Sequence, residues 1–172
     1  MAGWWMAWIA ATTASVALGI GLLLPQTRTG THEAVLPAPL ERVRGTILDV
    51  GTQAAWRRDV EAVDVAADGR TWTERTRAGE RLRFELVEAT DARVSLRFDS
   101  TRGYRGEWIG ELAPTPDGGT RLRVRERATV ANPLSRLAAR LFFDPEAFAR
   151  RWVEELAAEL ARRGPVNTGA IR

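Results

Sequence analysis

The chain has 172 residues, which is enough for one domain of ordinary size with short additional segments. It contains no cysteine and a single histidine, His32, which excludes disulfides, thiol chemistry and most histidine-based metal sites and catalytic triads. All 25 basic residues are arginine and the formal net charge is only +3, a balance that argues against nucleic-acid binding.

The N-terminal segment is predicted to be a membrane anchor. Residues 2–24 carry no charged side chain, and at ~1.5 Å per residue a helix of this length crosses a hydrocarbon core of ~30 Å. A cleaved signal peptide is the alternative, but a basic start and a small-residue cleavage site are both missing. We therefore expect a transmembrane anchor at residues 1–25, a linker at residues 26–30 and a single-pass membrane location, with later arginines favouring a cytoplasmic domain.

The next part of the chain predicts a sheet built as a meander. Thr31–Leu36 is expected to be a strand, and a short or broken helix follows Pro39. Period-two alternation and turn signals then predict six strands. These are Val60–Val65, Thr71–Arg77, Arg81–Glu88, Arg93–Asp99, Tyr104–Leu112 and Thr120–Val130. Consecutive strands with such short connections pair in antiparallel fashion.

The C-terminal part of the chain predicts two consecutive helices. Asn132 can cap the first helix, whose apolar face carries Leu134, Leu137 and Leu141. Asp144 can cap the second helix, in which apolar residues from Phe148 to Leu160 recur at spacings of four and must pack on another surface. The tail, residues 164–172, is predicted to be flexible. The sequence therefore predicts an α+β fold.

Five short stretches, together with this order of elements, resemble one known superfamily. They are Leu36-Pro-Ala-Pro-Leu-Glu-Arg-Val43, Trp56-Arg-Arg-Asp-Val60, Gly106-Glu-Trp108, Gly119-Thr-Arg-Leu122 and Asn132-Pro-Leu-Ser-Arg136. The chain resembles the START-like superfamily (SRPBCC), in particular its polyketide cyclase/dehydrase and lipid-transport proteins. The resemblance implies a helix-grip domain at residues 31–163, in which a curved antiparallel sheet of about seven strands wraps a long C-terminal helix and leaves a cavity.

Strand alternation predicts which residues face that helix. On the last strand the inward row is apolar except for Glu126, a carboxylate that must be paired, hydrated or protonated. Glu126 is therefore expected either to contact a ligand or to pair with an arginine or backbone donor at the sheet rim. The complete set of predicted ligand-contacting residues is Trp72, Glu74, Phe84, Leu96, Phe98, Tyr104, Trp108, Glu126, Phe148 and Trp152.

The leading functional prediction is a membrane-tethered binding or transport module for a hydrophobic small molecule or lipid. One alternative is a cyclase or dehydratase acting on a bulky apolar substrate, with Glu126 and Tyr104 as the acid–base candidates. Another is a structural or interaction protein whose cavity is filled. No motif predicts a metal site, a cofactor, a nucleophile or a phosphate-binding loop. Outward rows of arginine suggest a surface for anionic lipid head groups or RNA as a further alternative. Glu85, Glu107 and Glu111 are expected on the same outer face, however, which predicts a neutralised surface and no nucleic-acid partner.

Overall fold

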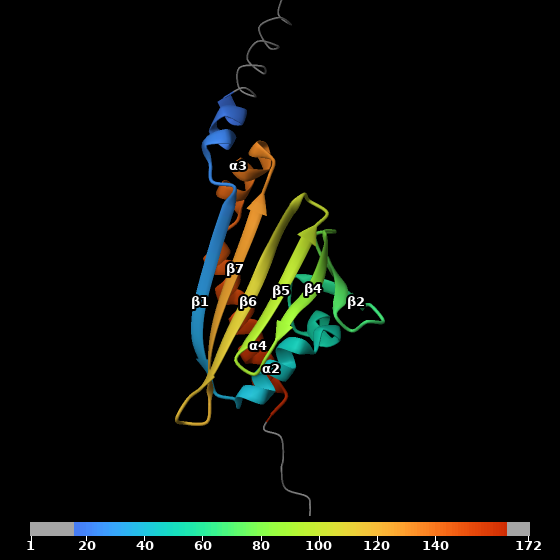
Figure 1. Cartoon of the computed structure of the whole chain (residues 1–172), viewed down its shortest axis with the longest axis vertical. Coiled ribbons are helices and arrows are strands. Elements are labelled where there is room, and N and C mark those ends of the chain that lie inside the picture. The colour runs from blue at the N-terminus through green and yellow to red at the C-terminus, as the bar shows by residue number, and fades with distance from the viewer. Residues whose placement is uncertain (1–15, 165–172) are drawn as a thin grey trace, which may run out of the picture.

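The protein is described by a computed structural model that covers residues 16–164. Seven strands form one antiparallel sheet in the order β1-β7-β6-β5-β4-β3-β2 (Figure 1). Their bounds are β1 Thr27–Leu36, β2 Val60–Val65, β3 Thr71–Thr76, β4 Arg81–Ala89, β5 Arg93–Ser100, β6 Tyr104–Pro114 and β7 Thr120–Val130. The predicted meander is confirmed. Strand β1 begins earlier than the predicted Thr31, because Thr27–Gly30 also pairs with β7.

Besides the helical residues 16–23, four helical segments accompany the sheet in the described part of the chain. Their bounds are α2 Leu40–Leu48, the 3₁₀ helix η1 Val50–Ala55, α3 Pro133–Phe142 and α4 Pro145–Arg162. The predicted caps form: the Asn132 side chain accepts hydrogen bonds from the backbone N–H groups of Leu134 and Ser135, and Asp144 caps α4 in the same way. The two C-terminal helices are therefore confirmed, with a break between them at Phe143 and Asp144.

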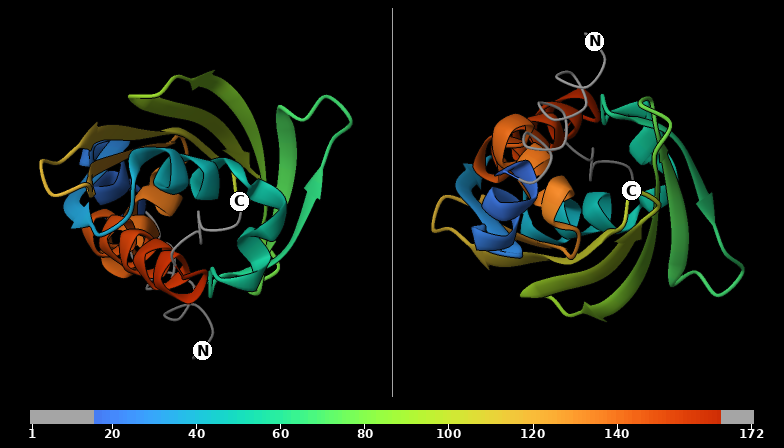
Figure 2. Two further views of the ribbon diagram at one scale, coloured as in Figure 1. Left: turned by 90° about the horizontal axis from the view of Figure 1, so that it is seen from below. Right: turned by 90° about the horizontal axis from the view of Figure 1, so that it is seen from above.

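The sheet curves around α4, which lies against its concave face near β1 and β7 (Figure 2). Close approach between α4 and β1 depends on Gly30, because a Cβ atom there would overlap the Pro145 carbonyl. Val94, Leu122 and Leu156 have no solvent exposure, so the core lies between the sheet and this helix. The predicted α+β fold, with a curved seven-stranded sheet and a long C-terminal helix, is confirmed.

The prediction of a single-pass membrane location is corrected here. Among the described residues, no helix is long and apolar enough to cross a membrane. The predicted single-pass location is wrong on this finding, and residues 1–15 of the predicted anchor lie outside the described residues.

Helix α3 is held by arginines that bond to backbone carbonyls. Arg136 is buried and donates to the carbonyls of Val130 (3.0 Å) and Ala131 (2.7 Å). Arg28 of β1 donates to two carbonyls at the C-terminal end of α3, each at 2.6 Å. By contrast, Leu134 and Leu141 are exposed. The apolar face predicted for this helix therefore does not fix its position.

We predict that Gly30→Ala destabilises the fold, because the added Cβ would collide with backbone at Pro145 and push α4 away from β1. Overpacking of this kind costs about 1–3 kcal/mol in the free energy of unfolding, which chemical denaturation would measure. Gly45→Ala is the matched control, since a Cβ atom there meets nothing within 4 Å in the described structure. Equal effects of the two substitutions would contradict the prediction.

Candidate functional site

A row of aromatic side chains crosses the concave face of the sheet from β3 to β6. The rings of Trp72 and Phe84 stack with centroids 5.3 Å apart, and Phe84 lies 5.5 Å from Phe98. Phe98 in turn meets Tyr104 edge-on at 6.2 Å. These contacts follow from the strand register, in which Trp72 is opposite Phe84 and Phe84 is opposite Phe98. The row gives the interior a continuous apolar wall.

A second aromatic cluster connects this wall to α4. The Trp152 ring of α4 lies 4.8 Å from that of Trp108 on β6, and 6.1 Å from that of Trp56 beyond η1. In the strand register, Trp108 is opposite Glu126 on β7. Glu126 therefore lies directly beside this tryptophan cluster on the sheet.

Glu74 and Arg57 form a buried ion pair inside the grip. Nη1 of Arg57 lies 2.8 Å from both carboxylate oxygens of Glu74, whose side chain is 2% exposed. The same nitrogen donates to the Gln53 side chain at 2.9 Å, and the indole of Trp72 donates to Glu74 at 3.3 Å. The Glu74 carboxylate is thus fully engaged, which makes its role structural.

Glu126 is a different kind of interior carboxylate. Within residues 16–164 no hydrogen bond or ion pair involves its side chain, and it is partly accessible to solvent. Surrounding protein raises the pKa of Glu126 to about 7, mainly by desolvation, with the negative charge of Glu74 raising it further and Arg57 opposing the shift. Near neutral pH this group can therefore donate or accept a proton or a hydrogen bond.

A third polar cluster lies at the end of the aromatic row. Ser100 donates a short hydrogen bond to Glu80, and Arg102 lies 3.6 Å from the same carboxylate. Burial and hydrogen bonding to Glu80 raise the pKa of Tyr104 well above its ordinary value. The Tyr104 hydroxyl therefore stays protonated and is occupied by a structural partner, which makes it a poor general base.

Exposure of the inward side chains changes along β7. Leu122 and Val124 have no exposure, whereas Glu126, Ala128 and Val130 are partly exposed. The concave face is thus close-packed at the end near α2 and accessible at the end that carries Glu126. Any ligand held by the grip would contact this accessible half.

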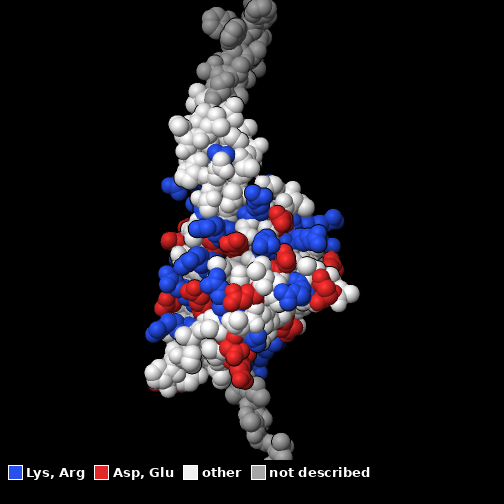
Figure 3. Space-filling model, viewed as in Figure 1, with Lys and Arg blue, Asp and Glu red and all other residues white. Residues whose placement is uncertain are grey.

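The convex face of the sheet carries interspersed charges of both signs (Figure 3). Arg97 lies 3.2 Å from Glu85, and Arg93 lies 3.6 Å from Glu111, each across neighbouring strands. Opposite charges on adjacent strands compensate one another in this way. These contacts agree with the neutralised outer surface predicted from the sequence.

The structure gathers most of the predicted ligand-contacting residues on one surface. Trp72, Glu74, Phe84, Leu96, Phe98, Tyr104, Trp108 and Glu126 line the concave face, and Trp152 faces them from α4. Phe148 does not join the aromatic row, because its ring packs against Phe143 at 5.8 Å. Sequence reasoning missed Arg57 and Glu80, since each adjoins a turn where charged residues are usually solvated.

The family model for polyketide cyclase/dehydrase and lipid-transport proteins matches residues 27–163. The chain belongs to this family. The matched range starts with β1 and ends just after α4, so it includes the sheet, the aromatic wall and every residue of the candidate site. A comparison with curated protein sequences found no match.

Solved structures of similar fold match about four fifths of this chain. A conserved protein from Geobacillus kaustophilus has a TM-score of 0.67 and 14% identity, with 78% of this chain and 96% of that chain covered. An aromatase/cyclase from Streptomyces sp. R1128 has a TM-score of 0.64 and 14% identity, with 84% and 99% covered. A START superfamily protein from Mycobacterium smegmatis has a TM-score of 0.57 and 15% identity, with 81% and 97% covered. At these identities the similarity shows a shared fold alone.

We predict that Arg57→Leu strongly destabilises the domain, because it leaves the Glu74 carboxylate buried without its counter-charge. Removing one partner of a buried pair costs about 3–5 kcal/mol in the free energy of unfolding. Adding Glu74→Leu should recover most of that loss, since the unpaired charge is then gone. Chemical denaturation of the single and double variants measures both effects. A double variant no more stable than Arg57→Leu alone would refute the assignment.

A second prediction concerns the pH dependence of stability. Between the ordinary pKa of 4.5 and about 7, the folded chain keeps a proton on Glu126 that the unfolded chain has released. The free energy of unfolding contributed by this group should therefore fall as the pH rises through that window. Denaturant midpoints measured across it should fall for the wild type relative to Glu126→Gln. Parallel curves for the two proteins would show that the pKa of Glu126 is not raised.

Proposed function

We propose that this protein binds a hydrophobic small molecule or lipid between the sheet and α4, with Glu126 as the polar contact. One observation carries the proposal: a partly buried carboxyl group without a protein partner among the described residues, next to a wall of aromatic rings. An apolar pocket with one or two well-placed polar groups is the usual form of a small-molecule site. Membership of the family supports this ligand class.

The aromatic wall determines which chemical class of ligand would bind well. Planar rings and long apolar chains both gain by leaving water and packing against Trp108, Phe98 and Phe84. Because Glu126 has no partner of its own in the described structure, a ligand hydroxyl, amine or N–H group can satisfy it. The preferred ligand is therefore an apolar molecule that carries one hydrogen-bond donor.

A cyclase or dehydratase activity is the second candidate. The observation that favours it is the raised pKa of Glu126, about 7, because a general acid or base works best when its pKa is close to the working pH. The Tyr104 hydroxyl is engaged by Glu80, so Glu126 is the catalytic candidate in this version of the proposal. Turnover of a bound apolar substrate that Glu126→Gln abolishes would distinguish an enzyme from a carrier.

The binding proposal predicts a donor preference that depends on Glu126. The full-length protein is titrated with N-phenyl-1-naphthylamine, a fluorescent apolar probe, which is then displaced by a long-chain alcohol and by an alkane of equal length. The alcohol should bind about fivefold more tightly, as expected from a net hydrogen-bond contribution of about 1 kcal/mol. Glu126→Leu should remove this preference, because no acceptor remains.

The matched control is Glu107→Gln, which changes a carboxylate on the adjacent strand that faces outward. This variant should bind the probe and discriminate between alcohol and alkane as the wild type does. Absence of probe binding by the wild type would refute the ligand site. An unchanged alcohol preference in Glu126→Leu would refute the role of Glu126.

A further inference from the structure

The grip is closed differently along its two long sides. On the β1 side, backbone approaches backbone where Gly30 meets the first turn of α4. On the other side, β2 is the free edge of the sheet and packs on η1. We call this second side the seam, defined by residues 55–59, which begin with the last residue of η1, and residues 151–162 of α4. In both views of Figure 2, α4 faces the η1–β2 region across the open side of the curved sheet.

A groove of about 380 Å³ runs along the seam. Its lining includes Trp56, Arg58, Glu155, Glu159 and Arg162. Trp56 also contacts Trp152, whose ring meets Trp108 beside the Glu126 position. The Trp56 and Trp152 indoles thus connect the surface groove to the aromatic interior, with Trp56 on the groove side.

The Trp56 side chain contains an unsatisfied polar group. Its indole Nε1 is buried and has no hydrogen-bond partner in the described structure. A buried N–H group without an acceptor is unfavourable, and such groups are rare in native proteins. The observed position of the Trp56 ring therefore leaves a hydrogen-bond donor unused.

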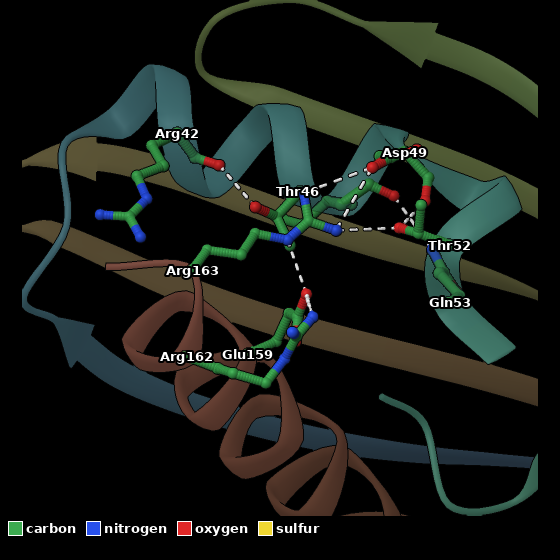
Figure 4. A network of polar contacts seen from close by, with 9 residues as sticks. Arg42, Thr46, Asp49, Thr52, Gln53, Glu159, Arg162 and Arg163 are labelled. Carbon is green, nitrogen blue, oxygen red and sulfur yellow. Dashed lines mark hydrogen bonds and ion pairs between the residues drawn. The ribbon is translucent and has the colours of Figure 1, made fainter. Parts of the chain in front are cut away.

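The two ends of the seam are held with different strength. At the C-terminal end of α4, the buried Glu159 carboxylate accepts from Arg162 and Arg163, and Arg163 also reaches Asp49 and Thr52 (Figure 4). At the Trp56 end, Arg58 lies 3.7 Å from Glu155, and the Arg58 side chain is 88% exposed. The Glu155 side chain is only 17% exposed, but an ion pair with one exposed partner contributes less to stability than the buried Glu159 contacts, so this end of the seam is the more weakly held.

We propose that the ligand reaches the interior through the seam. The Trp56 side chain blocks this entrance and moves to open it, and the Arg58–Glu155 ion pair holds the seam closed. This inference rests on the proposed ligand-binding function. The contacts of Glu159 with Arg162 and Arg163 then act as a fixed point. Residues 55–59 stay on the sheet, because Arg57 is paired with Glu74, and movement of α4 away from them exposes the tryptophan cluster. An apolar ligand passes along aromatic surface from the groove to Glu126.

The sequence offers a direct test, because the chain has no cysteine of its own. The full-length Arg58→Cys/Glu155→Cys variant is joined across the seam by a short bis-maleimide. Association and dissociation rates of N-phenyl-1-naphthylamine are measured by stopped flow before and after cross-linking. Both rates should fall by about tenfold or more when opening is prevented, as expected for a gated site. The equilibrium dissociation constant should change much less.

The matched control is Glu85→Cys/Arg97→Cys, joined by the same reagent across an outer-face ion pair that lies away from the seam. Its binding rates should not change. As a second measurement, Trp56→Ala removes the blocking ring and should accelerate both association and dissociation of the probe. Trp56→Phe keeps a ring in place and should have a smaller effect.

The outcomes separate the two proposals. Absence of probe binding to the wild type would refute the binding function itself. Probe binding with unchanged rates after cross-linking of the seam would leave the binding function intact and refute the entrance. The ligand would then reach Glu126 by another route, such as the accessible end of the concave face near Val130. Slower rates in the seam variant alone support the entrance.

Discussion

A single helix cannot cover the concave face of a curved seven-stranded sheet, and the rest of this structure depends on that constraint. Helix α4 packs against β1 and β7, at one side of the sheet. The remaining strands, from β3 to β6, have to bury their inner face in another way. Large aromatic side chains do so by reaching across the interior, and α2 and η1 close the far side. Aromatic residues suit this task because each buries a large area with few rotatable bonds.

The same constraint explains why acids occur inside the grip. Glu74, Glu80 and Glu126 occupy an interior that one helix does not fill, and their partners decide their roles. Arg57 neutralises Glu74, and Ser100 and Arg102 hold Glu80. Only Glu126 lacks such a partner within the described range. A position that needed only packing would have an apolar residue there, since an unpaired carboxylate costs stability.

Much of the fold could be predicted from the sequence. Alternation along β4, β5 and β7 is regular enough to assign each side chain to a face, and turn residues mark the strand ends. The position of Glu126 in an apolar row follows from this alternation alone. The partners of Glu74 could not be predicted from alternation, because Arg57 lies in a connection without periodicity and approaches β3 only in the folded chain.

Two other features had no reliable signal in the sequence. Helix α3 has a regular apolar face, yet the buried residue that fixes its place is Arg136, through bonds to backbone carbonyls. The apolar N-terminal residues predicted a membrane-spanning helix, a prediction that the described residues contradict. In both cases the apolar residues of a local segment did not predict its surroundings, which depend on residues distant in the sequence.

The absence of lysine has a consequence for how the helices unfold. Arg28 binds the last carbonyls of α3, and Arg42 of α2 binds the Leu160 carbonyl near the end of α4. A guanidinium group can bond several carbonyls at once in a fixed geometry, which an ammonium group does less well. The C-terminal turns of α3 and α4 are therefore tied to β1 and α2. Fraying of these turns, which is the usual first step in local opening, must break contacts to other elements, so helices and sheet lose structure as one cooperative unit.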